Sequence, residues 1–175
     1  PGLVSGLSPF KSELETELRL ILDWWAHHMV DEYNGGFYGT VSNNNEPADT
    51  EKGVVLNSRI LWTFSAAYNF LPADEYLTIA KRAFSYIEKN FIDYRYGGVF
   101  WSVDAKGKMK DGRKQIYGLA FCIYGLAEYY RASGDTAALI IAKDLYNNIE
   151  QYSFDNKNGG YIEAFTREWY NSGDL

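Results

Sequence analysis

Two kinds of helical pattern alternate along this chain. In segments 11–29, 72–91 and 135–152, apolar residues recur every three or four positions and the opposite side is polar, as is typical of a helix with one buried face. Segments 52–68 and 115–131 are apolar on every side, which indicates helices buried between others. The apolar positions of the one-sided segments are Leu14, Leu18, Ile21, Leu22, Trp25 and Met29; Tyr76, Ala80, Ala83, Phe84, Ile87 and Phe91; and Ala138, Ala142, Leu145, Tyr146, Ile149 and Tyr152.

A turn sequence repeats along the chain at a fixed spacing of 62 residues. Its copies are Asp31–Tyr38, Asp93–Phe100 and Asp155–Ile162, each with a Gly-Gly pair after the first four residues. Three copies in register indicate that the whole unit repeats. The glycine pairs predict tight turns with positive φ, and the aromatic and β-branched residues after them predict short β-hairpins.

The order of these segments predicts the architecture. One-sided and all-round apolar helices alternate with Gly-Gly turns between them, which describes an all-α protein with an outer and an inner layer of helices, as in an α/α toroid or solenoid. The third unit stops before its inner helix, so we expect five helices in an open arc. Such an arc leaves an apolar inner face uncovered. We therefore expect either that a longer ring continues from it or that a second copy pairs with it as a homodimer.

Composition narrows the possible partners and the compartment. A net charge of −6 and a pI near 4.9, without a basic run, argue against nucleic acid and against an anionic membrane surface. The single cysteine, Cys122, excludes a disulfide framework and favours a reducing, cytoplasmic setting. No apolar run is long enough to span a membrane. The first residues lack the pattern of a signal peptide and an initiator Met, so we expect a processed or engineered piece.

Arg59 is the most informative single residue, because it lies in the middle of an all-round apolar segment. An arginine buried among inner helices would have to pair with a carboxylate or with helix carbonyls. The alternative is that its guanidinium, a permanently charged fork of donors, holds a ligand. The residues alone leave both roles open.

The chain resembles the N-acylglucosamine 2-epimerase and cellobiose 2-epimerase family. The resemblance is carried by Asn57-Ser-Arg59-Ile-Leu-Trp62-Thr-Phe-Ser, by the Gly-Gly-Phe-Tyr-Gly turn at 35–39 and by segment 114–130, and it extends over nearly the whole chain. It implies an (α/α)6 barrel of which residues 1–175 are the N-terminal portion, with the C-terminal half missing. It also implies proton removal and return at C2 of a ring-opened sugar through an enediolate, by two histidines beyond residue 175.

The resemblance assigns roles to four residues of this sequence. Arg59 matches the family's pore-facing catalytic arginine and Tyr117 its sugar-contacting tyrosine, and Asn57 belongs to the arginine's motif. Phe121 lies one period after Arg59 and should face the same space, and Tyr117 should lie one helical turn away on the neighbouring inner helix. We expect a small sugar as the ligand and no cofactor.

Two other functions remain open at this point. A glycoside hydrolase of the same fold needs two carboxylates, whereas Glu128 is the only acid beyond the first turn of either inner segment. A helical-repeat binding module is disfavoured by the period, since common solenoids repeat at about 33–47 residues. His27 and His28 do not indicate a metal site, because adjacent helical residues point about 100° apart.

Overall fold

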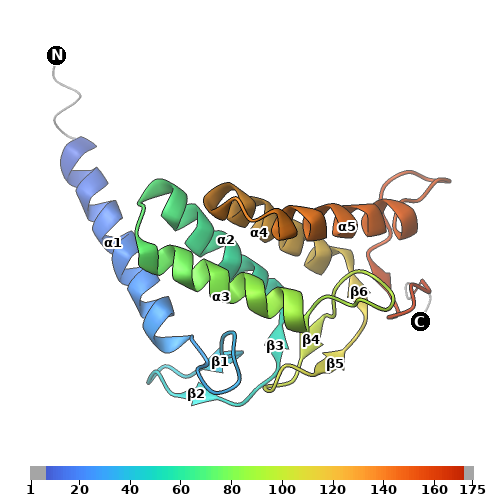
Figure 1. The fold of residues 1–175 in the computed structure, drawn as a ribbon, viewed down its shortest axis with the longest axis horizontal. Helices are drawn as coiled ribbons and strands as arrows, with labels where there is room; N and C mark the ends of the chain where they lie inside the picture. Colours follow the sequence, from blue (N-terminus) through green and yellow to red (C-terminus); the bar gives the residue numbers. More distant parts are fainter. Residues whose placement is uncertain (1–6, 172–175) are drawn as a thin grey trace.

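The computed structural model describes residues 7–171 and contains five α-helices joined by short strand pairs (Figure 1). The helices are α1 (Leu7–His28), α2 (Val54–Phe70), α3 (Asp74–Asn90), α4 (Ile116–Ser133) and α5 (Thr136–Tyr152). The strands are β1 (Thr40–Val41), β2 (Pro47–Ala48), β3 (Lys52–Gly53), β4 (Ser102–Val103), β5 (Met109–Asp111), β6 (Lys114–Gln115) and β7 (Ala164–Phe165).

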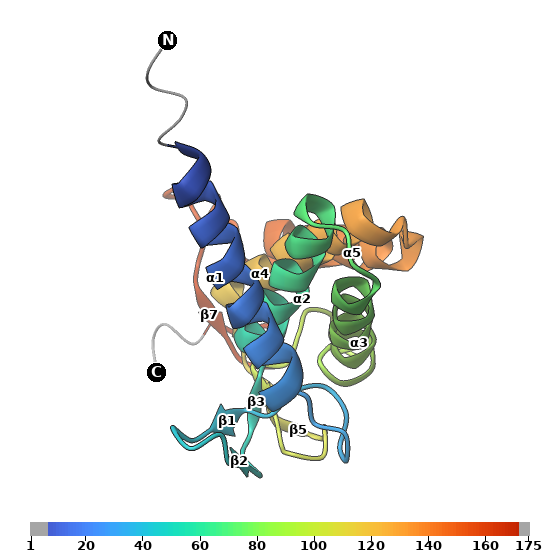
Figure 2. The same cartoon turned by 90° about the vertical axis from the view of Figure 1, so that its left-hand side faces the viewer.

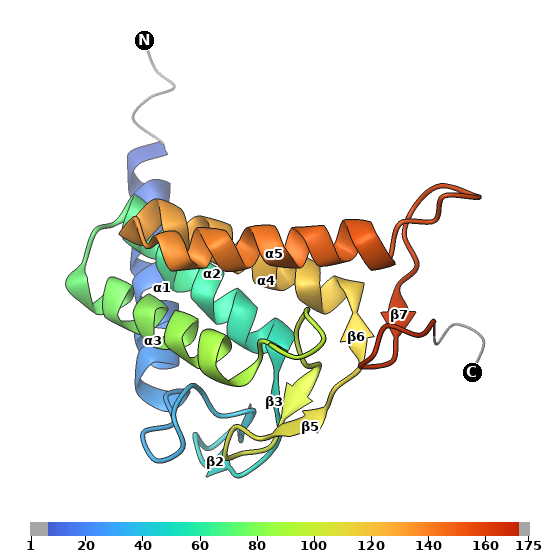
Figure 3. The same ribbon diagram turned by 45° about the vertical axis from the view of Figure 1, so that its right-hand side comes forward.

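Helices α2 to α5 form the two predicted layers. The inner helices α2 and α4 pack against each other, while α3 packs on α2 and α5 packs on α4. Figures 1 and 3 show α3 and α5 covering the same side of the inner pair. The prediction of alternating outer and inner helices with short hairpins between them is therefore confirmed.

The Gly-Gly turns are three copies of one structure. Each is closed by an antiparallel bridge, Val30 with Phe37, Ile92 with Val99 and Phe154 with Tyr161. All six glycines of the pairs have φ between 65° and 79°, which a residue with a Cβ adopts only at a cost. The predicted positive φ values are confirmed.

The hairpin of the following unit fixes the start of each inner helix. Strand β3, just before α2, pairs with β4, and β6, just before α4, pairs with β7. The first amide of α2, at Val54, donates to the carbonyl of Trp101, and the first amide of α4, at Ile116, donates to that of Glu163. Consecutive units are thus joined through their backbones as well as through their cores.

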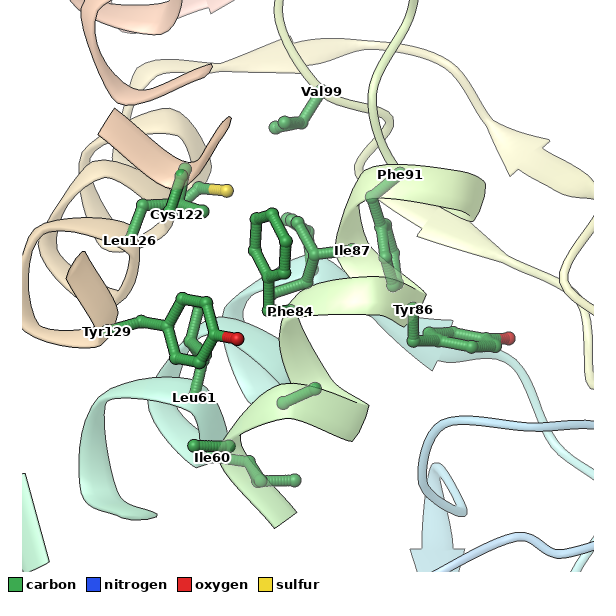
Figure 4. Packing of buried hydrophobic residues seen from close by; sticks show 14 of the residues in the cluster. Ile60, Leu61, Phe84, Tyr86, Ile87, Phe91, Val99, Cys122, Leu126 and Tyr129 are labelled. Carbon is green, nitrogen blue, oxygen red and sulfur yellow. The ribbon is translucent and has the colours of Figure 1, made fainter. Parts of the chain in front are cut away.

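The core lies between the inner and outer layers. Figure 4 shows Ile60 and Leu61 of α2 and Cys122 and Leu126 of α4 around Phe84 of α3. The Phe84 ring also stacks on Tyr129 of α4, with ring centroids 4.8 Å apart. One outer helix therefore touches both inner helices, which holds the layers together.

Parts of two predicted core faces are exposed. Leu14 and Ile21 of α1 are about half exposed although Leu22 and Met29 are buried. In the described part of the chain no helix lies beside the N-terminal half of α1, which carries Leu14 (Figure 2), and Ile21 faces the open cleft between α1 and α2. Tyr146 and Tyr152 of α5 are also exposed, so the prediction that they face the core is wrong. In the described range, no helix has the length and apolar character needed to cross a membrane.

Candidate functional site on the inner helices

Arg59 is exposed at the middle of α2. The prediction that this part of α2 is buried all round is wrong, because one side of the helix is covered only in part, by α1. There Arg59 lines a cleft of about 470 Å³ together with Ile21 and Trp25 of α1 and apolar residues of α2. No ion-pair or hydrogen-bond partner of Arg59 lies within residues 7–171, so its guanidinium is available to a ligand.

Tyr117 and Phe121 lie one turn apart on α4. Their rings meet edge to face with centroids 4.8 Å apart, and with Ala120 and Tyr124 they line a hollow of about 240 Å³. Tyr117 is 53% exposed, and its backbone amide donates to the Glu163 carboxylate at 3.2 Å. Half-exposed aromatic faces of this kind suit the C–H faces of a sugar ring.

The described residues do not bring the four predicted site residues into one pocket. Arg59 lines the cleft between α1 and α2, whereas Tyr117 and Phe121 line the separate hollow on α4. Asn57 is fully buried: its Nδ2 donates to the Gly53 carbonyl at 2.9 Å, and its Oδ1 has no partner in the described structure. The sugar-binding role of Asn57 stays a prediction.

A ring contact missed at the sequence level links the two inner helices. Trp62 of α2 stacks on Tyr124 of α4, with centroids 5.0 Å apart and planes 12° apart. Tyr124 also lines the hollow beside Tyr117. Trp62 lies three residues after Arg59, so this stack couples the helix of the arginine to the helix of the tyrosine.

Two buried ion pairs stand directly before the inner helices. The Nζ of Lys52 lies 2.7 Å from Asp31 Oδ2, and the Nζ of Lys114 lies 2.9 Å from Asp93 Oδ2. All four side chains are at most 1% exposed. The 62-residue spacing relates Lys52 to Lys114 and Asp31 to Asp93 in the sequence, but it does not say that each lysine reaches the aspartate 21 positions earlier. The pairs tie each Gly-Gly turn to the helix that carries a site residue.

The pKa values of the aspartates in these pairs are lowered. Burial raises the pKa of Asp93, but hydrogen bonds from Arg167 and Lys114 outweigh burial and hold it well below its usual range. Burial also raises the pKa of Asp31, but the hydrogen bond from Lys52 and those from Asn34 lower it, and the net pKa is below its usual value. Both carboxylates are therefore structural anions rather than proton donors or acceptors.

The histidines lie away from the inner helices. His27 contacts the Asp23 carbonyl through Nδ1 at 2.6 Å, and the ring of His28 lies against Trp24, all within α1. No group of three or more His, Cys, Asp or Glu side chains is arranged to hold a metal within residues 7–171. Cys122 is buried, and burial raises the pKa of its thiol to about 12, so it is not a nucleophile.

These features define the class of the protein. The inner helices carry the exposed Arg59, which has no ion-pair partner within residues 7–171, and half-exposed aromatic rings, and outer helices pack on them as in an α/α toroid. The family model for N-acylglucosamine 2-epimerase (GlcNAc 2-epimerase) matches residues 35–173. The chain belongs to this family.

Named relatives agree with the assignment. The chain is 47% identical to the cellobiose 2-epimerase of Bacteroides fragilis over 167 residues, which is 94% of this chain and 43% of that protein. It is 48% identical to a cellobiose 2-epimerase of Ruminococcus albus over 160 residues, 90% of this chain and 40% of that one. The structure of the Spirochaeta thermophila cellobiose 2-epimerase matches 97% of this chain and 42% of its own with a TM-score of 0.91 at 37% identity. The chain thus spans about two fifths of the length of such relatives.

Proposed function

We propose that the polypeptide to which these residues belong is a sugar 2-epimerase, and that residues 1–175 are the N-terminal portion of its single (α/α)6-barrel domain. The reaction inverts C2 of an aldose or an N-acylhexosamine by removing and returning a proton through an enediolate. The observation that carries the proposal is Arg59, exposed and without an ion-pair partner on an inner helix in the described chain. Family membership supplies the context.

The chemistry gives Arg59 a definite role. When a base removes the C2 proton of the open-chain sugar, negative charge develops on the oxygens at C1 and C2. A guanidinium that remains charged at all working pH values stabilises this charge without itself exchanging protons. Tyr117 and Phe121, which line the separate hollow on α4, would contact another part of the sugar. The acid and base are the two histidines that the family resemblance places beyond residue 175.

Cellobiose is the substrate that we propose. The similarity is carried by relatives named cellobiose 2-epimerase, at 47% and 48% identity. Tyr117 and Tyr124 are each about half exposed and line one hollow on α4, which supports stacking of a sugar ring there. Mannose and N-acetylmannosamine are the competing substrates.

Proton NMR in D2O tests the proposal. The complete natural polypeptide should exchange the C2 proton of cellobiose faster than that of mannose or N-acetylmannosamine. The variant R59M should exchange about 100-fold more slowly, because it loses the donors that face the enediolate. The matched control R131M removes an exposed arginine of α4 that pairs with Glu128, and its exchange should be unchanged. Exchange by R59M at the parent rate would overturn the role of Arg59, and absence of exchange with all three sugars would overturn the proposed activity.

The hydrolase alternative finds no support in these residues. Glu128 accepts from Asn69 Nδ2 at 2.7 Å and pairs with Arg131 at 2.7 Å, so its carboxylate is already engaged. Retaining and inverting glycosidases need a second carboxylate about 5–10 Å away. The 62-residue period disfavours a solenoid-type binding module, since common helical solenoids repeat at about 33–47 residues.

We further propose a cytoplasmic location and a closed ring. The single cysteine supports a reducing compartment. The matched relatives are more than twice the length of this chain, which supports coverage of the inner face by later helices of the same polypeptide. A homodimer is the alternative cover for that face.

A further inference from the structure

The outer side of the first repeat unit carries a groove that the sugar chemistry does not use. We call it the first groove. It has a volume of about 560 Å³ and lies between the first Gly-Gly turn, the C-terminal half of α3 and the turn that joins β4 to β5. Four basic residues line it: Arg82 and Lys89 of α3 and Lys106 and Lys108 of the β4–β5 turn.

The repeat provides a comparison within the same molecule. One unit later, a second groove of about 250 Å³ is lined by the second Gly-Gly turn and by α5, at the equivalent positions. The positions 62 residues after the four basic residues hold Asp144, Gln151, Glu168 and Tyr170. The shared architecture therefore does not require positive charge, and the basic residues of the first groove need a separate reason.

Most of this positive charge is not neutralised. Arg82 is engaged, since it donates to the carbonyls of Gly36 and Asp31 and pairs with Glu32 at 3.2 Å. Lys89, Lys106 and Lys108 are exposed and have no ion-pair partner within residues 7–171. In a chain of net charge −6, three unpaired lysines around one hollow mark a local site for an anion.

A buried phenol supplies an independent observation. Tyr86 lines the first groove and is only 6% exposed, and its hydroxyl has no hydrogen-bond partner in the described structure. Its ring meets that of Phe91 edge to face, and Figure 4 shows its hydroxyl at the end that points away from the labelled core residues. Burial, with smaller contributions from Asp31 and Asp104, raises the pKa of Tyr86 to about 12, so the hydroxyl remains a donor.

The second groove satisfies the equivalent position internally. Asn148 lies one period after Tyr86, and its Oδ1 accepts from the Gly98 amide at 2.7 Å. The first groove thus differs from its counterpart in two respects, free ammonium groups and a buried donor without an acceptor. An anion with several oxygens would supply a counter-charge to the ammonium groups and an acceptor to the Tyr86 hydroxyl.

We propose that the first groove binds the phosphate group of a small phosphorylated solute. Lys89, Lys106 and Lys108 bind the phosphate oxygens, and the Tyr86 hydroxyl donates to one of them. The groove is larger than a phosphate ion, which leaves room for the rest of the solute. The site is independent of the proposed sugar reaction.

A titration of the complete polypeptide with inorganic phosphate tests this proposal. With [15N]glycine labelling, the amides of Gly35, Gly36 and Gly107 report on the first groove, and those of Gly97 and Gly98 report on the second. Phosphate, compared with chloride at equal ionic strength, should shift the first set and leave the second unchanged. The double variant K106Q/K108Q should weaken binding by about tenfold or more, because it removes two charge-assisted contacts. Lys81→Gln, an exposed lysine of α3 outside the groove, is the matched control and should bind as the parent does.

The Tyr86→Phe variant and the comparison of the glycine signals complete the test of phosphate binding. Tyr86→Phe should weaken phosphate binding without lowering stability, since it removes a buried hydroxyl that has no partner among residues 7–171. Equal shifts in the two glycine sets, or an unchanged midpoint in K106Q/K108Q, would show general anion screening and overturn the proposal. A first-groove titration that K81Q weakens as much as K106Q/K108Q does would overturn it as well.

Discussion

At the scale of single residues, the two buried lysines are the most instructive. Lys52 and Lys114 are equivalent by repeat, and each pairs with the aspartate of a Gly-Gly turn. Their surroundings differ, because Asp93 also accepts two hydrogen bonds from Arg167, at 2.8 and 3.1 Å. The Asp31 carboxylate has Lys52 as its only cationic partner in the described structure. The lysine–aspartate pair of the second unit thus has a second cation, Arg167, whereas that of the first unit has none in the described structure.

This asymmetry predicts unequal effects of the same substitution. Lys52→Met should lower the free energy of unfolding of the complete polypeptide by about 3–5 kcal/mol, because it leaves Asp31 buried and without a cation. Lys114→Met should cost less, since Arg167 still neutralises Asp93. Urea unfolding measures both.

Lys110→Met is the control for this comparison. Its pair with Glu51 is exposed, so its loss should stay within about 1 kcal/mol. Equal losses for Lys52→Met and Lys114→Met would contradict the compensating role of Arg167.

The same aspartates predict acid lability. Their pKa values are lowered in the folded state, so as pH falls through about 4 the unfolded chain takes up protons before the folded chain does. Their contribution is therefore complete above about pH 5 and declines below about pH 4, by up to about 1.4 kcal/mol per pH unit for each carboxylate. Urea unfolding at pH 5 and pH 3 checks this, and equal stability at the two values would contradict it.

At the scale of elements, the contact between α2 and α4 depends on a missing side chain. A Cβ on Gly125 of α4 would lie 2.7 Å from the carbonyl oxygen of Ser58 on α2, which is backbone and cannot move aside alone. The close approach of the inner helices is thus set at this point. The distance between α2 and α4 in turn affects the separation of Arg59 on α2 from Tyr117 on α4.

Gly125→Ala therefore tests the packing of the inner layer. Overpacking costs about 1–3 kcal/mol, while alanine favours the helix by about 1 kcal/mol, so a net loss of up to about 2 kcal/mol in unfolding free energy is expected. Gly53→Ala is the matched control, because nothing lies within 4 Å of its added Cβ. Its stability in urea should equal that of the parent, whereas a Gly125→Ala variant more stable than the parent would show that the helices do not meet as described.

Helix positions could be predicted from the sequence because period and burial agree along most of each element. The prediction of 115–131 corresponds to α4 at Ile116–Ser133, and that of 135–152 to α5 at Thr136–Tyr152. The prediction of core-facing residues failed at exposed aromatic residues such as Tyr146, because the apolar stripe of the helix is wider than the surface on which the helix packs. An apolar stripe in the sequence shows that a helix is amphipathic, but it does not show how much of the stripe the neighbouring elements cover.

At the scale of the whole molecule, exposed apolar surface distinguishes a chain fragment from a complete ring. Leu14 and Ile21 of α1 and Tyr117 and Tyr124 of α4 are each about half exposed. Residues 1–175 expressed alone should therefore bind the dye ANS more strongly than the complete polypeptide does.

Sedimentation of residues 1–175 and of the complete polypeptide distinguishes the two ways of covering this apolar face, by later helices of the same chain or by a second copy. A complete polypeptide that is monomeric, beside a short chain that self-associates, would support ring closure by later helices. Dimerisation of both through α1 and α2 would support the homodimer. A short chain that neither binds ANS nor associates would contradict the open-arc description.

The sequence by itself determined the repeat, the order of inner and outer helices and the family. These are properties of spacing and side-chain type, which a linear pattern carries: glycines for positive φ, apolar periodicity for burial. Only the tertiary structure decided that Arg59 is exposed, that Asn57 is buried, that Lys52 and Lys114 reach Asp31 and Asp93, and that the two grooves differ in charge. Each of these depends on which elements lie beside a residue, and exposure, ion pairing and local charge are set by neighbours distant along the chain.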